Sequence, residues 1–296
     1  MTTGSSTLPR IALVTPVLNS ARYLEQTIQS VLLQHYPNLD YFIVDGASTD
    51  GSLDIIRKYD SQISGWLSEP DQGMYDAINK GFARTTGEIM GWISATDMLQ
   101  VGGLFVAGDV FRDLPTVQWI TGRRTVFGDD GATVRVDPLM RWSRLRFLLG
   151  ASSRHIQQES TFWRRRLWDK AGAYVDASSR IASDFELWIR FFRYAQLHSV
   201  DSLIGGFREH PDSGSLLDLA TFNARCDRLA YDELRACRVW ARRLRDFDSA
   251  ALRVPKLRFF WYNARKLITS ALYKVPGPDW PPVIRNNSQT GWYLDT

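Results

Sequence analysis

Residues 11–46 read IALVTPVLNSARYLEQTIQSVLLQHYPNLDYFIVDG, and this stretch decides the fold. Residues 11–17 and 41–46 are continuous apolar runs rich in β-branched side chains, which predict two buried strands. Between them, residues 21–34 place apolar side chains three and four positions apart, which predicts an amphipathic helix. A helix that joins two buried strands is typical of a parallel crossover unit.

The same alternation continues beyond this unit. Residues 52–56 begin a second helix, 63–67 form a short strand, 74–85 form a third helix and 87–94 form a fourth strand. We therefore expect an α/β fold, a Rossmann-like αβα sandwich with a mostly parallel central sheet. In such sheets, ligands bind beyond the carboxyl ends of the strands. Polar residues follow four of the predicted strands: Thr15 and Asn19, Asp45, Glu69 and Asp71, and Asp97.

The rest of the chain divides into segments of different character. With 44% hydrophobic and 23% charged residues among 296, the composition excludes a disordered chain and allows one large domain. Residues 183–195, SDFELWIRFFRYA, predict a strong helix with Ser183 as its cap, and residues 221–247 and 256–274 predict two basic amphipathic helices. The last twenty residues contain Pro and Gly and are expected to form a loose arm.

These segments define the expected domain organisation. Residues 1–8 are expected to form a flexible N-terminus, 9–220 the α/β domain and 221–296 a basic helical C-terminal extension.

Cysteine usage and the N-terminal sequence bear on location. Cys226 and Cys237 lie eleven positions apart in one predicted helix, which is too far for a disulfide within a straight helix, so both are expected to be reduced. MTTGSSTLPR lacks the pattern of a signal peptide, and the chain has no apolar run long enough to span a membrane. The sequence therefore favours a cytoplasmic protein.

Six motifs occur in order between residues 9 and 215, and together they resemble the family 2 glycosyltransferases. The resemblance is to members with the GT-A fold, of the bacterial polysaccharide and O-antigen assembly type. The motifs are TPVLN (15–19), VDGASTDGS (44–52), SEPDQGMYDAINKG (68–81), GEIMGWISATD (87–97), QQESTFWRR (157–165) and SDFELWIR (183–190).

The resemblance implies an inverting transferase. Residues 9–220 would be its catalytic domain, with a nucleotide-binding half over 9–100 and an acceptor half over 101–220. Such an enzyme moves a sugar from a nucleoside-diphosphate sugar to a hydroxyl of a glycan acceptor, in particular a lipid-linked one, and it uses a divalent metal, Mn or Mg. The positions that match the family's nucleotide- and donor-binding motifs are Thr15, Pro16, Asn19, Asp45, Glu69, Asp71, Tyr75 and Thr96. A carboxylate only accepts hydrogen bonds, so Asp45 suits the N–H edge of uracil or guanine. The alternative is that Asp45 builds the Asp-Gly turn.

The family's metal motif falls on Ala95-Thr96-Asp97, and here the sequence departs from the usual pattern. The family places a second acid at or near Thr96, whereas this chain keeps Asp97 alone. One or two carboxylates suffice when diphosphate oxygens and waters complete the shell. His210 lies where related enzymes place a metal-binding histidine, although a lone histidine is equally often structural, and Arg208 beside it suits phosphate oxygens.

Asp184 matches the family's general base, which takes the proton of the acceptor hydroxyl. The alternative is a helix-capping carboxylate. Gln157, Gln158 and Trp163 match positions on the acceptor side, although core packing is the commoner fate of tryptophan.

The C-terminal segment has an uneven charge. Residues 221–296 carry 14 Lys and Arg against 7 Asp and Glu, whereas the rest of the chain is slightly acidic. Residues 221–274 are therefore a candidate for binding an anionic membrane, which would place the protein at the inner face of the plasma membrane. The alternative is helices packed on the catalytic domain, and no nucleic-acid partner is expected.

Two other functions remain open. A sugar nucleotidyltransferase needs a glycine-rich basic loop after the first strand, which TPVLNSARYL lacks. A catalytically impaired module that binds nucleotide sugars is favoured only by the missing acid at Thr96. A dinucleotide-binding dehydrogenase is disfavoured, because no GxGxxG motif follows the first strand.

Overall fold

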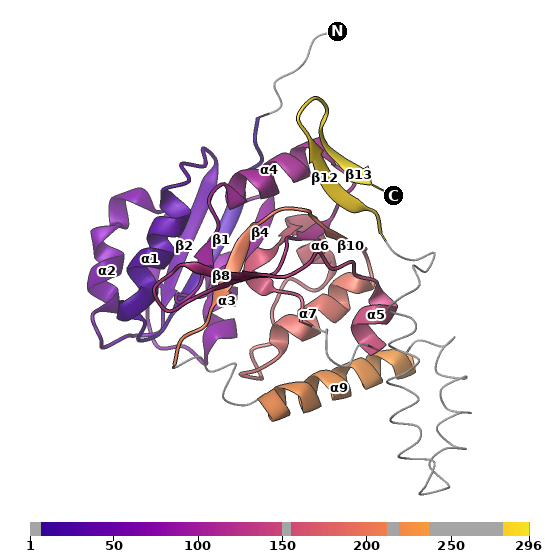
Figure 1. The fold of residues 1–296 in the computed structure, drawn as a ribbon. Helices are drawn as coiled ribbons and strands as arrows, with labels where there is room; N and C mark the ends of the chain where they lie inside the picture. Colours follow the sequence, from indigo (N-terminus) through magenta and orange to yellow (C-terminus); the bar gives the residue numbers. More distant parts are fainter. Residues whose placement is uncertain (1–6, 150–154, 212–218, 237–280, 296) are drawn as a thin grey trace, which may run out of the picture.

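The computed structural model describes residues 7–149, 155–211, 219–236 and 281–295, and a central sheet lies in the middle of these residues (Figure 1). The sheet has seven strands in the order β10-β6-β9-β4-β1-β2-β3. All neighbours pair in parallel except β9, which is antiparallel to both β4 and β6. The strands are β1 (Ile11–Val17), β2 (Leu39–Asp45), β3 (Gly65–Ser68), β4 (Ile89–Trp92), β6 (Trp119–Thr121), β9 (Thr161–Arg164) and β10 (Leu197–Ser199).

Helices cover both faces of this sheet, which confirms the predicted αβα sandwich. Side chains on β1 alternate between the two faces: Ile11 and Leu13 enter one buried cluster, whereas Ala12 and Val14 enter the other. The first cluster includes side chains of α1 (Ala21–Leu32), α2 (Ser52–Lys58) and α4 (Gly103–Asp113). The second includes side chains of α3 (Met74–Phe82), α6 (Arg165–Lys170) and α7 (Ser183–Phe192).

A second, smaller sheet has the strand order β5-β11-β7-β8. Its strands are β5 (Met98–Leu99), β7 (Thr125–Phe127), β8 (Thr133–Val136) and β11 (Gly205–Arg208). The segments outside both sheets include the 3-10 turns η1 (Asp60–Gln62) and η2 (Gln158–Ser160) and the short helix α5 (Arg144–Leu149). Because β5 pairs with β11, the loop after β4 lies against a strand more than a hundred residues away.

The C-terminal part departs from the predicted arm. The last described residues form an antiparallel hairpin of β12 (Val283–Asn287) and β13 (Gly291–Asp295). Ile284 and Trp292 are buried in the core, and Val200 after β10 bridges to Ile284. The prediction of a loose arm for this stretch was wrong, because two apolar side chains anchor it to the edge of the central sheet.

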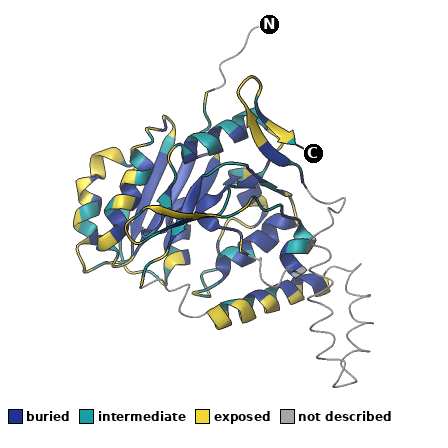
Figure 2. Ribbon diagram, in the orientation of Figure 1, coloured by how far each residue is buried: buried dark blue, intermediate teal, exposed yellow. Residues whose placement is uncertain are grey.

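Helix α9 (Leu219–Ala236) corresponds to the first part of the predicted basic helix 221–247 and packs on α5 and α7. Its buried side chains, Cys226, Ala230, Glu233 and Leu234, follow a helical spacing, and its other side faces solvent (Figure 2). Glu233 is 5% exposed and bonds Arg144 of α5 and Arg193 after α7, each at 2.5 Å. Cys226 is a free thiol.

Other predictions fall outside the described residues or are corrected by them. Cys237 and the predicted helix 256–274 lie outside the described residues. Ser183 is the first residue of α7 rather than its cap; the cap is Ala182, whose φ is 56°. Among the described residues, no helix combines the length and the apolar character needed to cross a bilayer.

Candidate functional site

Asp97 follows β4 and is held in the interior by contacts with β11 and α1. Its side chain is 2% exposed, and its Oδ1 accepts a hydrogen bond of 2.8 Å from the backbone N–H of Arg208 on β11. On the other side, the hydroxyl of Thr27 on α1 donates to the carbonyl oxygens of Ala95 and Asp97, at 2.8 and 2.7 Å. Burial raises the pKa of Asp97 to about 6, although the Arg208 N–H opposes the shift.

Glu159 lies beside Asp97, and sequence analysis did not select it. It sits on η2, is 8% exposed, and its carboxyl group shares a hydrogen bond with Asp97. Burial, followed by the charges of Asp97 and Asp184, raises the pKa of Glu159 well above its ordinary value. The available signal was the glutamate inside the QQESTFWRR motif (157–165), directly before β9.

Asp184 lies in the first turn of α7, where it accepts hydrogen bonds from its own backbone N–H and that of Phe185. Burial raises the pKa of Asp184, and the nearby His155 opposes this shift. The Tyr75 hydroxyl on α3 lies 3.5 Å from Asp184 Oδ1. His155 is exposed to solvent, yet the surrounding protein lowers the pKa of its imidazole by desolvation, against the effect of Asp184.

Hydrogen bonds connect the segments that follow the carboxyl ends of β1 and β2. Asp45 is fully buried and accepts from the backbone N–H of Ser48 and from the Ser68 hydroxyl, at 3.1 and 2.6 Å. Asn19 is exposed, and its Oδ1 accepts from the Thr49 N–H at 2.9 Å. The structure thus shows the turn-building contacts of Asp45, and its contact with a nucleobase stays a prediction.

The remaining residues of the predicted nucleotide-binding set differ in accessibility. Thr15 and Pro16 are buried in β1, where the Thr15 hydroxyl bonds that of Tyr41 at 3.0 Å, so neither side chain is open to a nucleotide. Asp71 is partly exposed, its Oδ1 accepts from the Gly73 N–H at 2.7 Å, and its carboxylate packs on Gly46. Glu69 is half-exposed and pairs with Lys80 at 3.0 Å.

The sequence predicts that Arg208 contacts a phosphate. In the structure, its side chain instead bonds the loop that carries Asp97. It has no exposed surface, and its Nε donates to the carbonyl oxygen of Thr96 at 2.7 Å. Its Nη1 donates to Gln26 and to the carbonyl of Asp129, at 2.6 and 3.1 Å. Its guanidinium also lies over the Tyr23 ring, which contacts the ring of His210 at 4.8 Å between centroids.

The three predicted acceptor-side residues build the scaffold instead. Gln157 is 3% exposed, and its amide bonds both the N–H and the carbonyl of Thr125, at 2.8 and 2.7 Å. The amide of Gln158 donates to the carbonyl of Trp92. Trp163 has no exposed surface and packs against Trp92 in the core. None of these side chains is placed to line an acceptor cleft.

Contacts link the strand ends to the two catalytic candidates. Asp71 packs on Gly46, next to Asp45, and begins the loop that leads into α3. Tyr75 on that helix reaches Asp184, and Glu159 lies within the influence of the charges of both Asp184 and Asp97. The structure therefore brings the predicted base and the predicted metal ligand to one edge of the sheet.

The fit of a divalent metal depends on Asp97 and Glu159. No group of three or more His, Cys, Asp or Glu side chains that could hold a metal occurs within the described residues. The Oε2 atom of Glu159 is buried and finds no hydrogen-bond donor in the described part of the chain. Two adjacent buried carboxyl groups match the one or two carboxylates with which Mg²⁺ is usually held beside phosphates. The residues present thus fit a metal that needs diphosphate oxygens to complete its shell.

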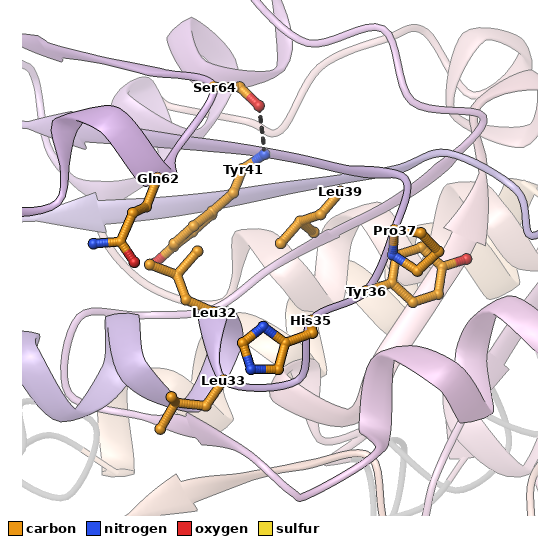
Figure 3. A pocket seen from close by; sticks show the side chains of 9 residues that line it. All are labelled: Leu32, Leu33, His35, Tyr36, Pro37, Leu39, Tyr41, Gln62 and Ser64. Carbon is orange, nitrogen blue, oxygen red and sulfur yellow. Dashed lines mark hydrogen bonds between the residues drawn. The ribbon is translucent and has the colours of Figure 1, made fainter.

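A separate pocket of about 340 Å³ lies at the opposite edge of the sheet (Figure 3). Its lining comes from the end of α1, the start of β2 and the segment before β3, where Ser64 Oγ accepts a hydrogen bond of 3.1 Å from the Tyr41 N–H. It contains no carboxylate, so it lacks the chemistry of a metal-diphosphate site.

Comparison with known proteins identifies the family. The model of glycosyl transferase family 2 matches residues 12–172. The chain belongs to glycosyl transferase family 2. An uncharacterized glycosyltransferase of Mycobacterium tuberculosis, Rv1514c, is 28% identical over 62% of this chain and 68% of its own length. A Mycobacterium bovis protein named PGL/p-HBAD biosynthesis glycosyltransferase is 28% identical over 62% of this chain and 70% of its own length.

Solved structures place the fold in the GT-A class. Staphylococcus aureus TarS 1–349 in complex with UDP-GlcNAc is 17% identical, with a TM-score of 0.60 over 76% of this chain and 66% of that chain. The mannosyltransferase PcManGT of Pyrobaculum calidifontis, in complex with GDP-Man and Mn²⁺, is 18% identical, with a TM-score of 0.52 over 89% and 86%. The match spans only 37% of a longer relative from Rickettsia conorii.

Proposed function

We propose that this chain is an inverting glycosyltransferase that moves a sugar from a nucleoside-diphosphate donor to a hydroxyl of a glycan acceptor. The observation that carries the proposal is that Asp97 and Asp184, 87 positions apart in the sequence, both lie near Glu159. Family membership supports the reaction class, and TarS and PcManGT were solved with sugar nucleotides bound.

The roles of the two carboxylates follow from their surroundings. Asp184 lies at the start of α7, next to the Tyr75 hydroxyl, and its raised pKa improves its ability to accept a proton from the acceptor hydroxyl. That oxygen attacks the anomeric carbon from the side opposite the leaving diphosphate, and a single displacement inverts the anomeric centre. Tyr75 and the N–H groups of the α7 turn hold Asp184 in place during proton transfer.

Asp97 is the residue proposed to hold a divalent cation, Mn or Mg. His210, the second ligand predicted from the sequence, lies against the Tyr23 ring, and the described residues contain no group of three possible metal ligands. When bound, such a cation neutralises the charge that develops on the leaving diphosphate. Arg208 keeps the Asp97 carboxylate in position through its backbone N–H, and its Nε fixes the Thr96 carbonyl. Asn19, Glu69 and Asp71 are the proposed donor-binding residues with exposed surface.

The acceptor and the location of the protein are further parts of the proposal. A lipid-linked glycan and a site at the inner face of the membrane are supported by the basic charge of residues 221–274. The described part of that segment, α9, buries its apolar side against α5 and α7, and its exposed Arg228 and Arg235 are balanced by Asp227 and Asp232. The proposed membrane contact therefore relies on the basic sequence of residues 237–274, which lie outside the described residues. Sedimentation with anionic liposomes tests this; an absence of binding at low salt would remove the membrane from the proposal.

A calorimetric titration tests the donor. UDP, GDP and dTDP are titrated with and without Mn²⁺ into the wild type and into Asp97→Asn. We expect one nucleotide to bind at least ten-fold more tightly with Mn²⁺, and this gain to disappear in Asp97→Asn. If all three nucleotides bind equally weakly in both conditions, the proposed function is wrong.

A further inference from the structure

Glu159 sits on one of the most tightly fixed pieces of backbone in the described structure. Gln157 before it bonds both backbone groups of Thr125, and Ser160 after it donates to the carbonyl of Gly205 at 2.5 Å. Gly205 itself approaches so closely that a Cβ atom there would overlap the Glu159 carbonyl oxygen. Four separate segments thus hold η2 in place, and the direction of the Glu159 side chain is set by the fold.

The carboxyl group at the end of this side chain has incomplete hydrogen bonding. It shares one hydrogen bond with Asp97, while Oε2 is buried and has no donor within the described residues. A buried polar atom without a partner costs roughly 1–3 kcal/mol. A second carboxyl group beside Asp97 is tolerated when the pair keeps a proton or binds a cation. The unpartnered Oε2 atom favours a site that is completed by a cation.

We propose that Glu159 is the second carboxylate ligand of the divalent metal held by Asp97, in place of the acid that is missing at Thr96. This inference rests on the proposed function, because the metal's remaining ligands are the diphosphate oxygens of the donor. One or two protein carboxylates usually hold Mg²⁺ beside phosphates, and Asp97 with Glu159 supplies two.

A simpler role for Glu159 is to hold Asp97 in place through a hydrogen bond, without contact to the metal. Glu159→Gln separates the two roles, because glutamine keeps an N–H donor for Asp97 and removes the second anionic oxygen. If Glu159 only positions Asp97, glutamine takes over that role and the affinity for the metal does not change. Glu233→Gln is the matched control, since Glu233 is also a buried glutamate but lies between α9, α5 and α7.

Manganese binding is measured by the electron paramagnetic resonance signal of free Mn²⁺, first with the metal alone and then with UDP or GDP added. The proteins are the wild type, Glu159→Gln, Glu233→Gln and Asp97→Asn. We expect Glu159→Gln to bind Mn²⁺ at least ten-fold more weakly than the wild type, Glu233→Gln to match the wild type within two-fold, and Asp97→Asn to lose binding.

Each other outcome has a defined meaning. If Glu159→Gln binds Mn²⁺ like the wild type while Asp97→Asn does not, the inference is overturned and the proposed metal site stands. If Asp97→Asn binds like the wild type, or the wild type binds no Mn²⁺ in any condition, the metal site itself is wrong and the inference with it.

A second variant covers the case in which Glu159→Gln does not fold. Glu159→Asp keeps the charge but shortens the side chain by one methylene group. We expect its Mn²⁺ affinity to fall several-fold below the wild type, with an unchanged melting temperature in EDTA. Wild-type affinity in this variant would overturn the inference.

Discussion

Replacing Asp97 with asparagine is expected to stabilise the metal-free protein at pH 8. Burial raises the pKa of Asp97 from 3.8 to about 6, so the folded state holds the charged form less well than the unfolded state does. A shift of about 2 units, at 1.36 kcal/mol per unit, corresponds to about 3 kcal/mol. Asparagine removes this cost but offers the Arg208 N–H a neutral acceptor, which forfeits about 1 kcal/mol. The net gain is about 2 kcal/mol.

The sign of the effect depends on pH. Below about pH 4, Asp97 is protonated in both states and the cost is absent; it grows between pH 4 and 6 and is constant above pH 6. The advantage of Asp97→Asn should therefore be present at pH 8 and vanish at pH 4. Urea denaturation of both proteins in EDTA at the two pH values measures the free energy of unfolding. Equal stability of the two proteins at pH 8, or a difference that does not change with pH, would refute the reasoning.

Three further predictions concern other parts of the molecule. Glu233→Gln should lower the free energy of unfolding by about 1 kcal/mol at pH 7, because it removes the carboxylate shared by Arg144 and Arg193, whose side chains are 37% and 46% exposed and stay hydrated; urea denaturation measures it, and the absence of any loss would contradict the role of this contact. Tyr75→Phe should shift the acidic limb of the kcat profile to higher pH, because the Tyr75 hydroxyl lowers the pKa of Asp184; an unchanged limb would remove Tyr75 from the site. Asp184→Asn should keep donor affinity within about three-fold while turnover falls by at least about 100-fold, and wild-type turnover would disprove the assignment of the base.

The first strands of the central sheet could be predicted because the sequence pattern that indicates each strand lies within that strand. Residues 11–17 and 41–46 are buried strands on both faces, so they read as unbroken apolar runs, and the observed β1 and β2 match them within two residues. The hairpin β12–β13 was missed because its stability comes from the contacts of Ile284 and Trp292 with distant elements, which the Pro- and Gly-containing sequence around it does not reveal.

The candidate site was predictable in part. Asp97 and Asp184 follow from motif position, and the structure places both near Glu159. The sequence could not show which polar side chains the scaffold itself uses. Gln157 was expected to face the acceptor, but its amide matches a backbone N–H and carbonyl on β7, a partner 32 positions away. Arg208 likewise serves the Asp97 loop, because β11 brings it beside Thr96 and Gln26.

The central claim is that Asp97 and Asp184 lie at one site that binds the donor. A crystal structure with Mn²⁺ and a nucleoside diphosphate, with the metal located by anomalous diffraction, tests this claim most directly. We predict an anomalous peak about 2 Å from a carboxylate oxygen of Asp97 and in contact with diphosphate oxygens, with Asp184 facing the open side of the nucleotide. A nucleotide or a metal bound elsewhere, for example in the pocket beside Tyr36, would contradict the account.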